Sequence, residues 1–287
     1  MEDPFHLSPL WDALLAIYNE IARVCDKHGL RYYAADGTAL GAMRHNGFIP
    51  WDDDLDLFMP RPDYERFQSL VSKELPPYLK FVNHTNTGEF QRIFGKVQDC
   101  RRERIETIEA ATGRGLSNGL FVDIFPLDGY PMSFFSKLWL KARTAALVQY
   151  HAFKSYSFSA LPITGKLRWF LGFLVAPVCS IVLGKTSPLA ALEAIHSRNA
   201  YDSSEYVGSY DCELSIFRKP PVKKSVFGDG VEHAFAGQKI MIPSDCDTLL
   251  VNEFGDWRKL PPEECRCPSH EYSERVPWWL GPSLTKN

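Results

Sequence analysis

The feature that most constrains this chain is a run of aspartates set among apolar residues, in the stretch GFIPWDDDLDLFMPRPDY (residues 47–64). Asp52, Asp53, Asp54 and Asp56 occupy four of five consecutive positions. From position 52 to position 58, polar and apolar residues nearly alternate, which is the period of a β-strand. The pattern predicts a strand that carries Asp52, Asp54 and Asp56 on one face and packs its leucines into the core.

Carboxylates placed side by side repel one another, and one of them tends to stay protonated unless a cation binds between them. Mg²⁺ suits such a cluster because it takes oxygen ligands and is often held by one or two carboxylates together with substrate phosphates. A calcium-binding loop is excluded, since its glycine and glutamate positions are occupied here by Leu57 and Asp63. A solvated acidic turn is disfavoured by the apolar neighbours. The cluster therefore predicts half of a magnesium site whose other half is a phosphorylated substrate.

Two further features accompany the acidic run. Gly37 and Thr38 lie between an expected strand (30–35) and a short expected helix (38–45). A helix N-terminus of this kind exposes backbone N–H groups and can bind phosphate. Asp123 lies among apolar residues in a strand expected over 119–130. This order of a Gly-Thr turn, an Asp-x-Asp strand and a later aspartate resembles the nucleotidyltransferase superfamily, in which three acids hold Mg²⁺ against nucleotide phosphates.

Three blocks resemble a narrower group, the LicD family, which includes the fukutin-type enzymes. The first is DGTALGAMRHNGFIPWDDDLDLFMPRPDYERF (36–67), the second is GLFVDIFPLDGY (119–130), and the third is LLVNEFGDWRKLPPEECRCPSH (249–270). The resemblance implies transfer of a phospho-alcohol, such as phosphocholine, from a CDP-linked donor to a hydroxyl of a cell-surface glycan, with release of CMP. It implies Mg²⁺ as the cofactor, with Mn²⁺ as an alternative.

The resemblance also assigns roles to the residues of these blocks. Asp54 and Asp56 match the metal-binding pair, and Asp123 matches the third acid, which would bind metal or accept the acceptor's proton. Asp52 and Asp53 match the acidic run before the pair, where one of them would orient a metal-bound water or activate the acceptor hydroxyl. The phosphate-binding turn is matched by Gly37 and Thr38.

Cations are needed to bind a diphosphate, and four residues are candidates for substrate binding. Arg44 lies in the first block, and Arg92 and Lys96 would share one face of a strand expected over 90–98. His270 ends the third block and has a suitable unperturbed pKa for a general base. The alternative for each of them is a solvent-exposed or structural role.

The expected fold is α+β, with a nucleotidyltransferase-like core of mixed β-sheet and flanking helices over 1–130 and a mostly helical part over 131–287. Together they form a single domain. Helices are expected at 9–28, 133–156 and 188–200. Residues 169–183 are almost wholly apolar but fall short of the roughly 20 residues that span a membrane. They predict a buried core helix, with a helix resting on a membrane surface as the alternative.

Net charge, the N-terminal sequence and the cysteines indicate which partners and which cellular compartment to expect. A formal charge of −3 provides no basic field for nucleic acid. The N-terminus lacks a secretory signal, and seven scattered cysteines form no disulfide framework. We therefore expect a cytoplasmic protein, at the inner face of the membrane if residues 169–183 contact lipid and the glycan acceptor is lipid-linked. Two other functions stay open: a nucleotidyltransferase acting on a small acceptor, and an inactive glycan-binding relative.

Overall fold

The computed structural model describes residues 3–87, 90, 92–103, 119–155, 163–210 and 220–268. Its main sheet has the strand order β1-β2-β5-β4-β3, and β6 and β7 extend the sheet beside the second half of β5. Only β2 and β5 pair in parallel among these strands, so the sheet is mixed. The strands of this sheet are β1 (Tyr33–Ala34), β2 (Asp56–Pro60), β3 (Leu79–Val82), β4 (Gly95–Glu103), β5 (Gly119–Gly129), β6 (Tyr206–Ser209) and β7 (Val222–Lys223).

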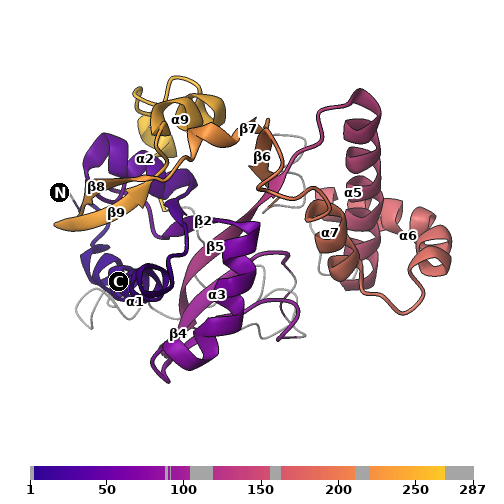
Figure 1. Cartoon of the computed structure of the whole chain (residues 1–287), viewed down its shortest axis with the longest axis horizontal. Helices are drawn as coiled ribbons and strands as arrows, with labels where there is room; N and C mark the ends of the chain where they lie inside the picture. Colours follow the sequence, from indigo (N-terminus) through magenta and orange to yellow (C-terminus); the bar gives the residue numbers. More distant parts are fainter. Residues whose placement is uncertain are drawn as a thin grey trace.

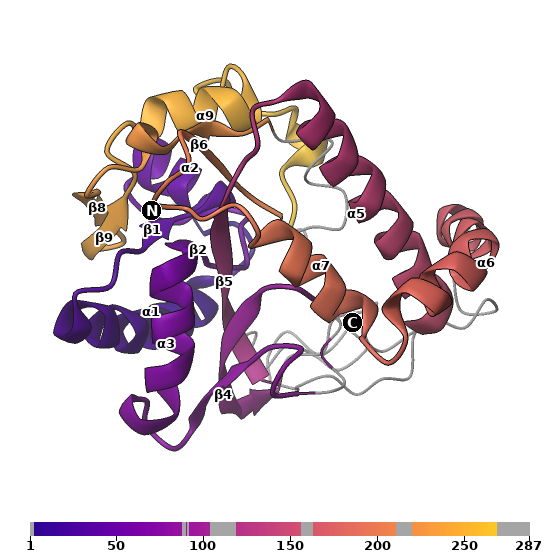
Figure 2. The same ribbon diagram turned by 45° about the vertical axis from the view of Figure 1, so that its right-hand side comes forward.

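Helices lie on both sides of this sheet, and the expected α+β class is confirmed. A separate hairpin, β8 (Val231–Phe235) and β9 (Gln238–Ile242), lies near α1 and α2 (Figure 1). Helices α5, α6 and α7 extend from the opposite side (Figure 2). The helices are α1 (Ser8–His28), α2 (Asp36–His45), α3 (Arg61–Glu74), α5 (Phe134–Ser155), α6 (Ile163–Leu183), α7 (Pro188–His196) and α9 (Cys246–Phe254), with short 3-10 turns η2 (Lys224–Val226) and η3 (Glu263–Cys265).

The two faces of the sheet differ in chemistry because side chains alternate along each strand. On one face, Leu57, Val122 and Ile124 are fully buried in a core that α1 and α3 complete. On the other face, Phe58 and Phe125 join a second apolar cluster, whereas Asp56 and Asp123 lie nearer the beginning of their strands. One face therefore stabilises the fold, and the other is available for a polar site.

The sequence predicts that Ser8 caps the first helix and that Gly29 ends it, and the structure confirms only the second prediction. Ser8 does not act as the cap; the carboxylate of Asp3 accepts hydrogen bonds from the backbone N–H groups of Leu7 and Ser8 at 2.6 and 2.9 Å. Gly29 ends the helix in the left-handed region at φ 60°, as predicted. From within α1, the indole of Trp11 donates to the backbone oxygen of Asp52 at 2.8 Å, so this helix also fixes the acidic loop.

Two expected strands begin later than predicted. β2 begins at Asp56, and residues 52–55 form an irregular segment before it. β4 begins at Gly95, so Arg92 lies ahead of the strand and does not share a strand face with Lys96. The sequence also predicts a strand over 103–109, and all but the first of these residues lie outside the described part of the chain. For β2, the alternating pattern begins at Asp52, whereas pairing with the neighbouring strand begins only at Asp56.

The prediction that residues 169–183 form a buried core helix is wrong. They lie in α6, whose large apolar side chains are mostly exposed, including Phe173 at 52% and Ile181 at 84%. α6 lies against α5 at the outer side of the molecule (Figures 1 and 2). The chain has no second layer there to cover it within the described residues.

A buried ion-pair network joins the sheet to the second half of the chain. Arg61, at the start of α3, donates two hydrogen bonds of 2.7 Å to Asp128 at the end of β5. It also donates to Glu193 of α7 at 3.0 Å. The second oxygen of Glu193 lies 2.8 Å from the ring of His84. These charges are tolerated in the interior because each has a closely placed partner.

Replacing Arg61 by methionine is expected to reduce the free energy of unfolding by about 3–5 kcal/mol, because the buried Asp128 carboxylate would lose its partner. Chemical denaturation would measure the change. Arg66→Met is the matched control on the same helix, since the Arg66 side chain is 57% exposed and such pairs contribute about 1 kcal/mol or less. Equal effects of the two substitutions would show that the network does not stabilise the fold.

Candidate active site

The acidic loop is held against α2 by close backbone contacts. Asn46 ends α2 in the left-handed region at φ 51°, and the chain then turns back along the helix. A Cβ atom on Gly41 would lie 2.5 Å from the backbone oxygen of Gly47, and one on Gly37 would lie 2.7 Å from Oδ2 of Asp52. These glycines allow the loop to approach. The Asp52 carboxylate thus lies beside the N-terminal turn of α2, where the helix dipole favours negative charge.

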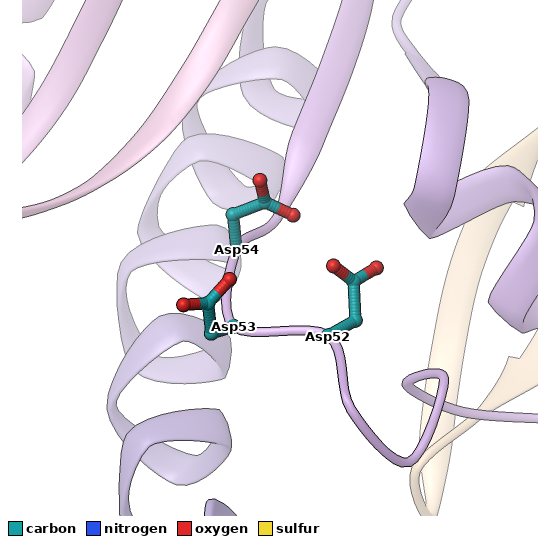
Figure 3. A group of neighbouring side chains, drawn as sticks. All are labelled: Asp52, Asp53 and Asp54. Atoms are coloured by element: carbon teal, nitrogen blue, oxygen red, sulfur yellow. The ribbon is translucent and has the colours of Figure 1, made fainter. Parts of the chain in front are cut away.

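The three consecutive aspartates gather at the end of this loop. Asp52, Asp53 and Asp54 each offer a carboxylate oxygen, and the three oxygens lie within 4.8 Å of one another. Figure 3 shows the Asp52 and Asp54 carboxylates pointing to the same side of the loop. Asp53 is fully buried, while Asp52 and Asp54 are half-buried. The loop therefore presents Asp52 and Asp54 to a common space.

The strands bring the remaining carboxylates together. In the parallel pairing of β2 with β5, Asp56 stands directly opposite Asp123. In the antiparallel pairing of β5 with β4, Asp123 stands opposite Lys96. Residues opposite each other on neighbouring strands point to the same face. Asp56, Asp123 and Lys96 therefore form a row across three strands, in which the Lys96 ammonium lies 3.5 Å from Oδ1 of Asp123.

The carboxylates of the loop lie close enough to those of the strands to affect their pKa values, so the two groups form one cluster. Burial raises the pKa of Asp56 well above its ordinary value, and the charges of Asp54, Asp123, Asp36 and Asp52 raise it further. Burial likewise raises the pKa of Asp52, together with the charge of Asp54. Lys96 supplies one positive charge at one edge of the row. The charges of four other carboxylates therefore act on Asp56, and the Lys96 ammonium lies beside one of them, Asp123.

This donor set fits a hard divalent cation. Mg²⁺ prefers carboxylate oxygens, and a cation removes the repulsion that raises the pKa values of Asp52 and Asp56. The residues predicted as metal ligands, Asp54, Asp56 and Asp123, belong to this one cluster, as do Asp52 and Asp53. Which of these carboxylates bind the metal stays a prediction.

The N-terminal turn of α2 forms one wall of the cluster. The Thr38 hydroxyl accepts a hydrogen bond of 2.9 Å from the backbone N–H of Asp56, so it ties α2 to the first residue of β2. The N-terminal N–H groups of a helix have no partner within that helix and suit an anion. Binding of phosphate by Gly37 and Thr38 stays a prediction, and the Asp52 carboxylate already lies beside this turn.

Asp36 is a further acidic residue that the sequence reasoning did not single out. Its backbone has φ 42°, an unfavourable region for a residue with a side chain, at the first position of α2. Such strain is often found at functional sites. Its charge also contributes to the raised pKa of Asp56. Its position directly before the Gly-Thr turn is the sequence signal that could have identified it.

The residues predicted to bind the substrate do not all lie at the carboxylate cluster. Lys96 lies in the carboxylate row. Arg44 lies at the C-terminal end of α2, where it donates to the backbone oxygen of Trp257 at 3.0 Å. Burial lowers the pKa of Arg44, and the nearby charge of Arg266 lowers it further.

Arg266, which the sequence reasoning did not name, also lies over the Trp51 ring at 5.9 Å. Arg92 is half-buried ahead of β4, and His270 lies outside the described residues.

Aspartates from a loop, two parallel-paired strands and a helix N-terminus thus gather on one face of the sheet. Residues 29–161 match the family model described as the LicD/FKTN/FKRP nucleotidyltransferase domain. That range contains the whole carboxylate cluster. The resemblance to the LicD family is therefore confirmed over residues 29–161, which contain the first two of the three sequence blocks.

Similarity to a known protein extends well beyond this domain. The chain is 28% identical over 267 residues to the lipopolysaccharide cholinephosphotransferase LicD of Haemophilus influenzae, covering 89% of this chain and 92% of that protein. An uncharacterised protein of Rickettsia typhi is 36% identical over 59 residues, 21% of this chain and 19% of its own length. An uncharacterised protein of Rickettsia prowazekii is 24% identical over 123 residues, 43% of this chain and 42% of its own.

Replacing Asp56 by asparagine is expected to lower turnover by at least about 100-fold, the scale seen when one charge-stabilising group is removed. Without divalent cations, the same variant should be at least as stable as the wild type, because it removes one charge from a repelling cluster. Steady-state kinetics and thermal unfolding measure the two effects. Asp12→Asn, at an exposed position of α1, is the control and should change neither quantity. Near-normal turnover of folded Asp56→Asn protein would contradict the site.

Proposed function

We propose that this protein is a LicD-type phosphotransferase that moves phosphocholine, or a similar phospho-alcohol, from a CDP-linked donor to a hydroxyl of a cell-surface glycan and releases CMP. The observation that supports it most is the carboxylate cluster, which lies within a LicD-family domain. The similarity to a lipopolysaccharide cholinephosphotransferase across 89% of the chain supports the choice of phosphocholine.

In this proposal Asp54, Asp56 and Asp123 would hold Mg²⁺, or Mn²⁺ in its place. The bound metal supplies charge neutralisation on the diphosphate, which is the main requirement of phosphoryl transfer. The attacked phosphorus is the one distal to the nucleoside, so CMP is the leaving group. The new bond joins this phosphorus to the acceptor oxygen, and the bond to the oxygen of CMP breaks.

The protein's own residues would position the reactants. The row across β2, β5 and β4 is rigid because its members are in hydrogen-bonded strands, and Lys96 holds Asp123 in place from its neighbouring strand. The Asp52 carboxylate points to the same side of the loop as the Asp54 carboxylate (Figure 3). From there Asp52 would accept the proton of the acceptor hydroxyl.

The reaction itself provides the direct test. Incubation with a panel of CDP-alcohols and a glycan acceptor should release CMP from CDP-choline, and EDTA should reduce that release by at least about 100-fold. Release of inorganic pyrophosphate from a nucleoside triphosphate would instead indicate a nucleotidyltransferase. Failure of the panel to give CMP with any donor would contradict the phosphotransferase assignment.

Metal binding can be measured without turnover. Mg²⁺ should raise the thermal unfolding temperature of the wild type, because a ligand that binds the folded state stabilises it by mass action. The increase should be lost in Asp54→Asn and Asp123→Asn and kept in Asp12→Asn. Equal stabilisation of all four proteins by Mg²⁺ would place the metal elsewhere.

A further inference from the structure

Helix α6 is apolar around its circumference, yet it contacts the protein along one narrow side. A Cβ atom on Gly172 would lie 1.9 Å from the backbone oxygen of Gln149 in α5, so the two helices touch at their backbones. Cys179, seven residues further on, is also buried. Away from this line, Ile181 and Val182 are 84% and 74% exposed. A helix that is apolar all round is normally surrounded by a protein core or by lipid.

The exposed apolar surface continues at the beginning of α5. Phe134 and Phe135 are 72% and 73% exposed, and Trp139 is 67% exposed. In the described part of the chain, 13 of the 17 exposed large apolar side chains lie between residues 132 and 182. Exposed apolar residues on most proteins are scattered, and a concentration marks an interaction site. We call the exposed side chains of α5 and α6 the α5–α6 surface.

The charge of the same segment identifies the partner. Between Asp128 and Glu193 the sequence has no aspartate or glutamate and seven lysines and arginines, at positions 137, 141, 143, 154, 166, 168 and 185. The segment therefore carries +7, and because the whole chain carries −3, the remainder carries −10. Apolar and aromatic side chains combined with exclusively positive charge suit a bilayer surface rich in anionic lipid.

We propose that the α5–α6 surface binds the interfacial region of an anionic lipid bilayer, with the α6 side chains in the acyl boundary and the lysines and arginines at the headgroups. A second copy of the chain is a poor occupant, since a symmetric contact through this surface would place +7 against +7. Anionic lipid neutralises the same charge. Long basic side chains can keep their charged ends at the headgroups while their stems lie in the apolar layer.

The geometry favours a helix that rests in the surface of the bilayer and does not cross it. The apolar run 169–183 is about 22 Å long at helical rise, against about 30 Å of hydrocarbon. Within the described residues no single helix is long and apolar enough to cross; a bent pair, Trp169–Leu183 with Pro188–His196, meets the criterion by length and composition alone. The second member of that pair is α7, which the Glu193–Arg61 ion pair fixes to the sheet.

A cavity at the edge of this surface fits a lipid headgroup. It has a volume of about 630 Å³ and lies between the first turns of α5 and the end of α7. Trp139, Arg143 and Arg198 contribute to its lining. A tryptophan beside two arginines supplies an interfacial aromatic ring and two donors for a phosphate.

Vesicle flotation with purified full-length protein tests the proposal. Wild-type protein should float with vesicles of phosphatidylcholine containing phosphatidylglycerol and remain with the soluble fraction when phosphatidylglycerol is omitted. Ile181→Glu should weaken the partition coefficient by at least about 10-fold, since burial of one large aliphatic side chain is lost. Val251→Glu is the matched control, because Val251 is 50% exposed on α9, away from this surface, and its substitution should leave binding unchanged.

A second pair of variants separates the charge contribution. Lys185→Glu should weaken binding to phosphatidylglycerol vesicles by at least about 5-fold, whereas Lys259→Glu, also exposed, should not. Light scattering without lipid should show that Ile181→Glu does not change the oligomeric state. The proposal is overturned if wild-type protein fails to float, if it floats equally without anionic lipid, or if Ile181→Glu dissociates a dimer. Because these readouts need no donor, they are independent of the phosphotransferase assay, in which Ile181→Glu should release CMP from CDP-choline at the wild-type rate when the acceptor is soluble.

Discussion

The parallel pairing of β2 with β5 is the constraint on which the site depends. It places Asp56 directly opposite Asp123, although 66 residues separate them in sequence. A parallel pair requires a long crossover, which is supplied here by α3, β3 and β4. A shift of register by one residue would turn one of the two aspartates into the apolar core. The apolar residues that flank both aspartates make such a shift unfavourable, so the same core that stabilises the fold also aligns the carboxylates.

The cost of bringing these acids together is offset by several local arrangements. Lys96 lies beside Asp123, the N-terminus of α2 lies beside Asp52, and the backbone of the acidic loop is held by Trp11. Burial nevertheless raises the pKa values of Asp52 and Asp56, and the charges of neighbouring carboxylates raise them further. The proposed Mg²⁺ would reduce the repulsion among these carboxylates.

Sequence reasoning was most successful where a pattern is local. The α1 helix, its glycine stop and the buried strand of Asp123 follow from periodicity and residue type. The start of β2 could not be predicted, because alternation runs on through Asp52 and Asp54 although pairing with β5 begins only at Asp56. Burial of α6 was predicted wrongly, since an apolar helix looks the same in sequence whether protein or another apolar medium surrounds it. The position of Arg44 at Trp257 depends on a contact across 213 residues that no spacing rule encodes.

The two side-chain contacts to Glu193 restrict how α7 can move relative to the sheet. Arg61 and His84 hold its two oxygens from separate elements, so a tilt of α7 and its neighbouring helices relative to the sheet would break both bonds together. β5 carries Asp123 near its start and ends at Gly129, six residues or about 20 Å further on, just before α5. The two bonds to Glu193 therefore restrict movement of α7 relative to the carboxylate cluster. If the α5–α6 surface rests on a bilayer as proposed, a lipid-linked acceptor must extend from that bilayer to the carboxylate cluster.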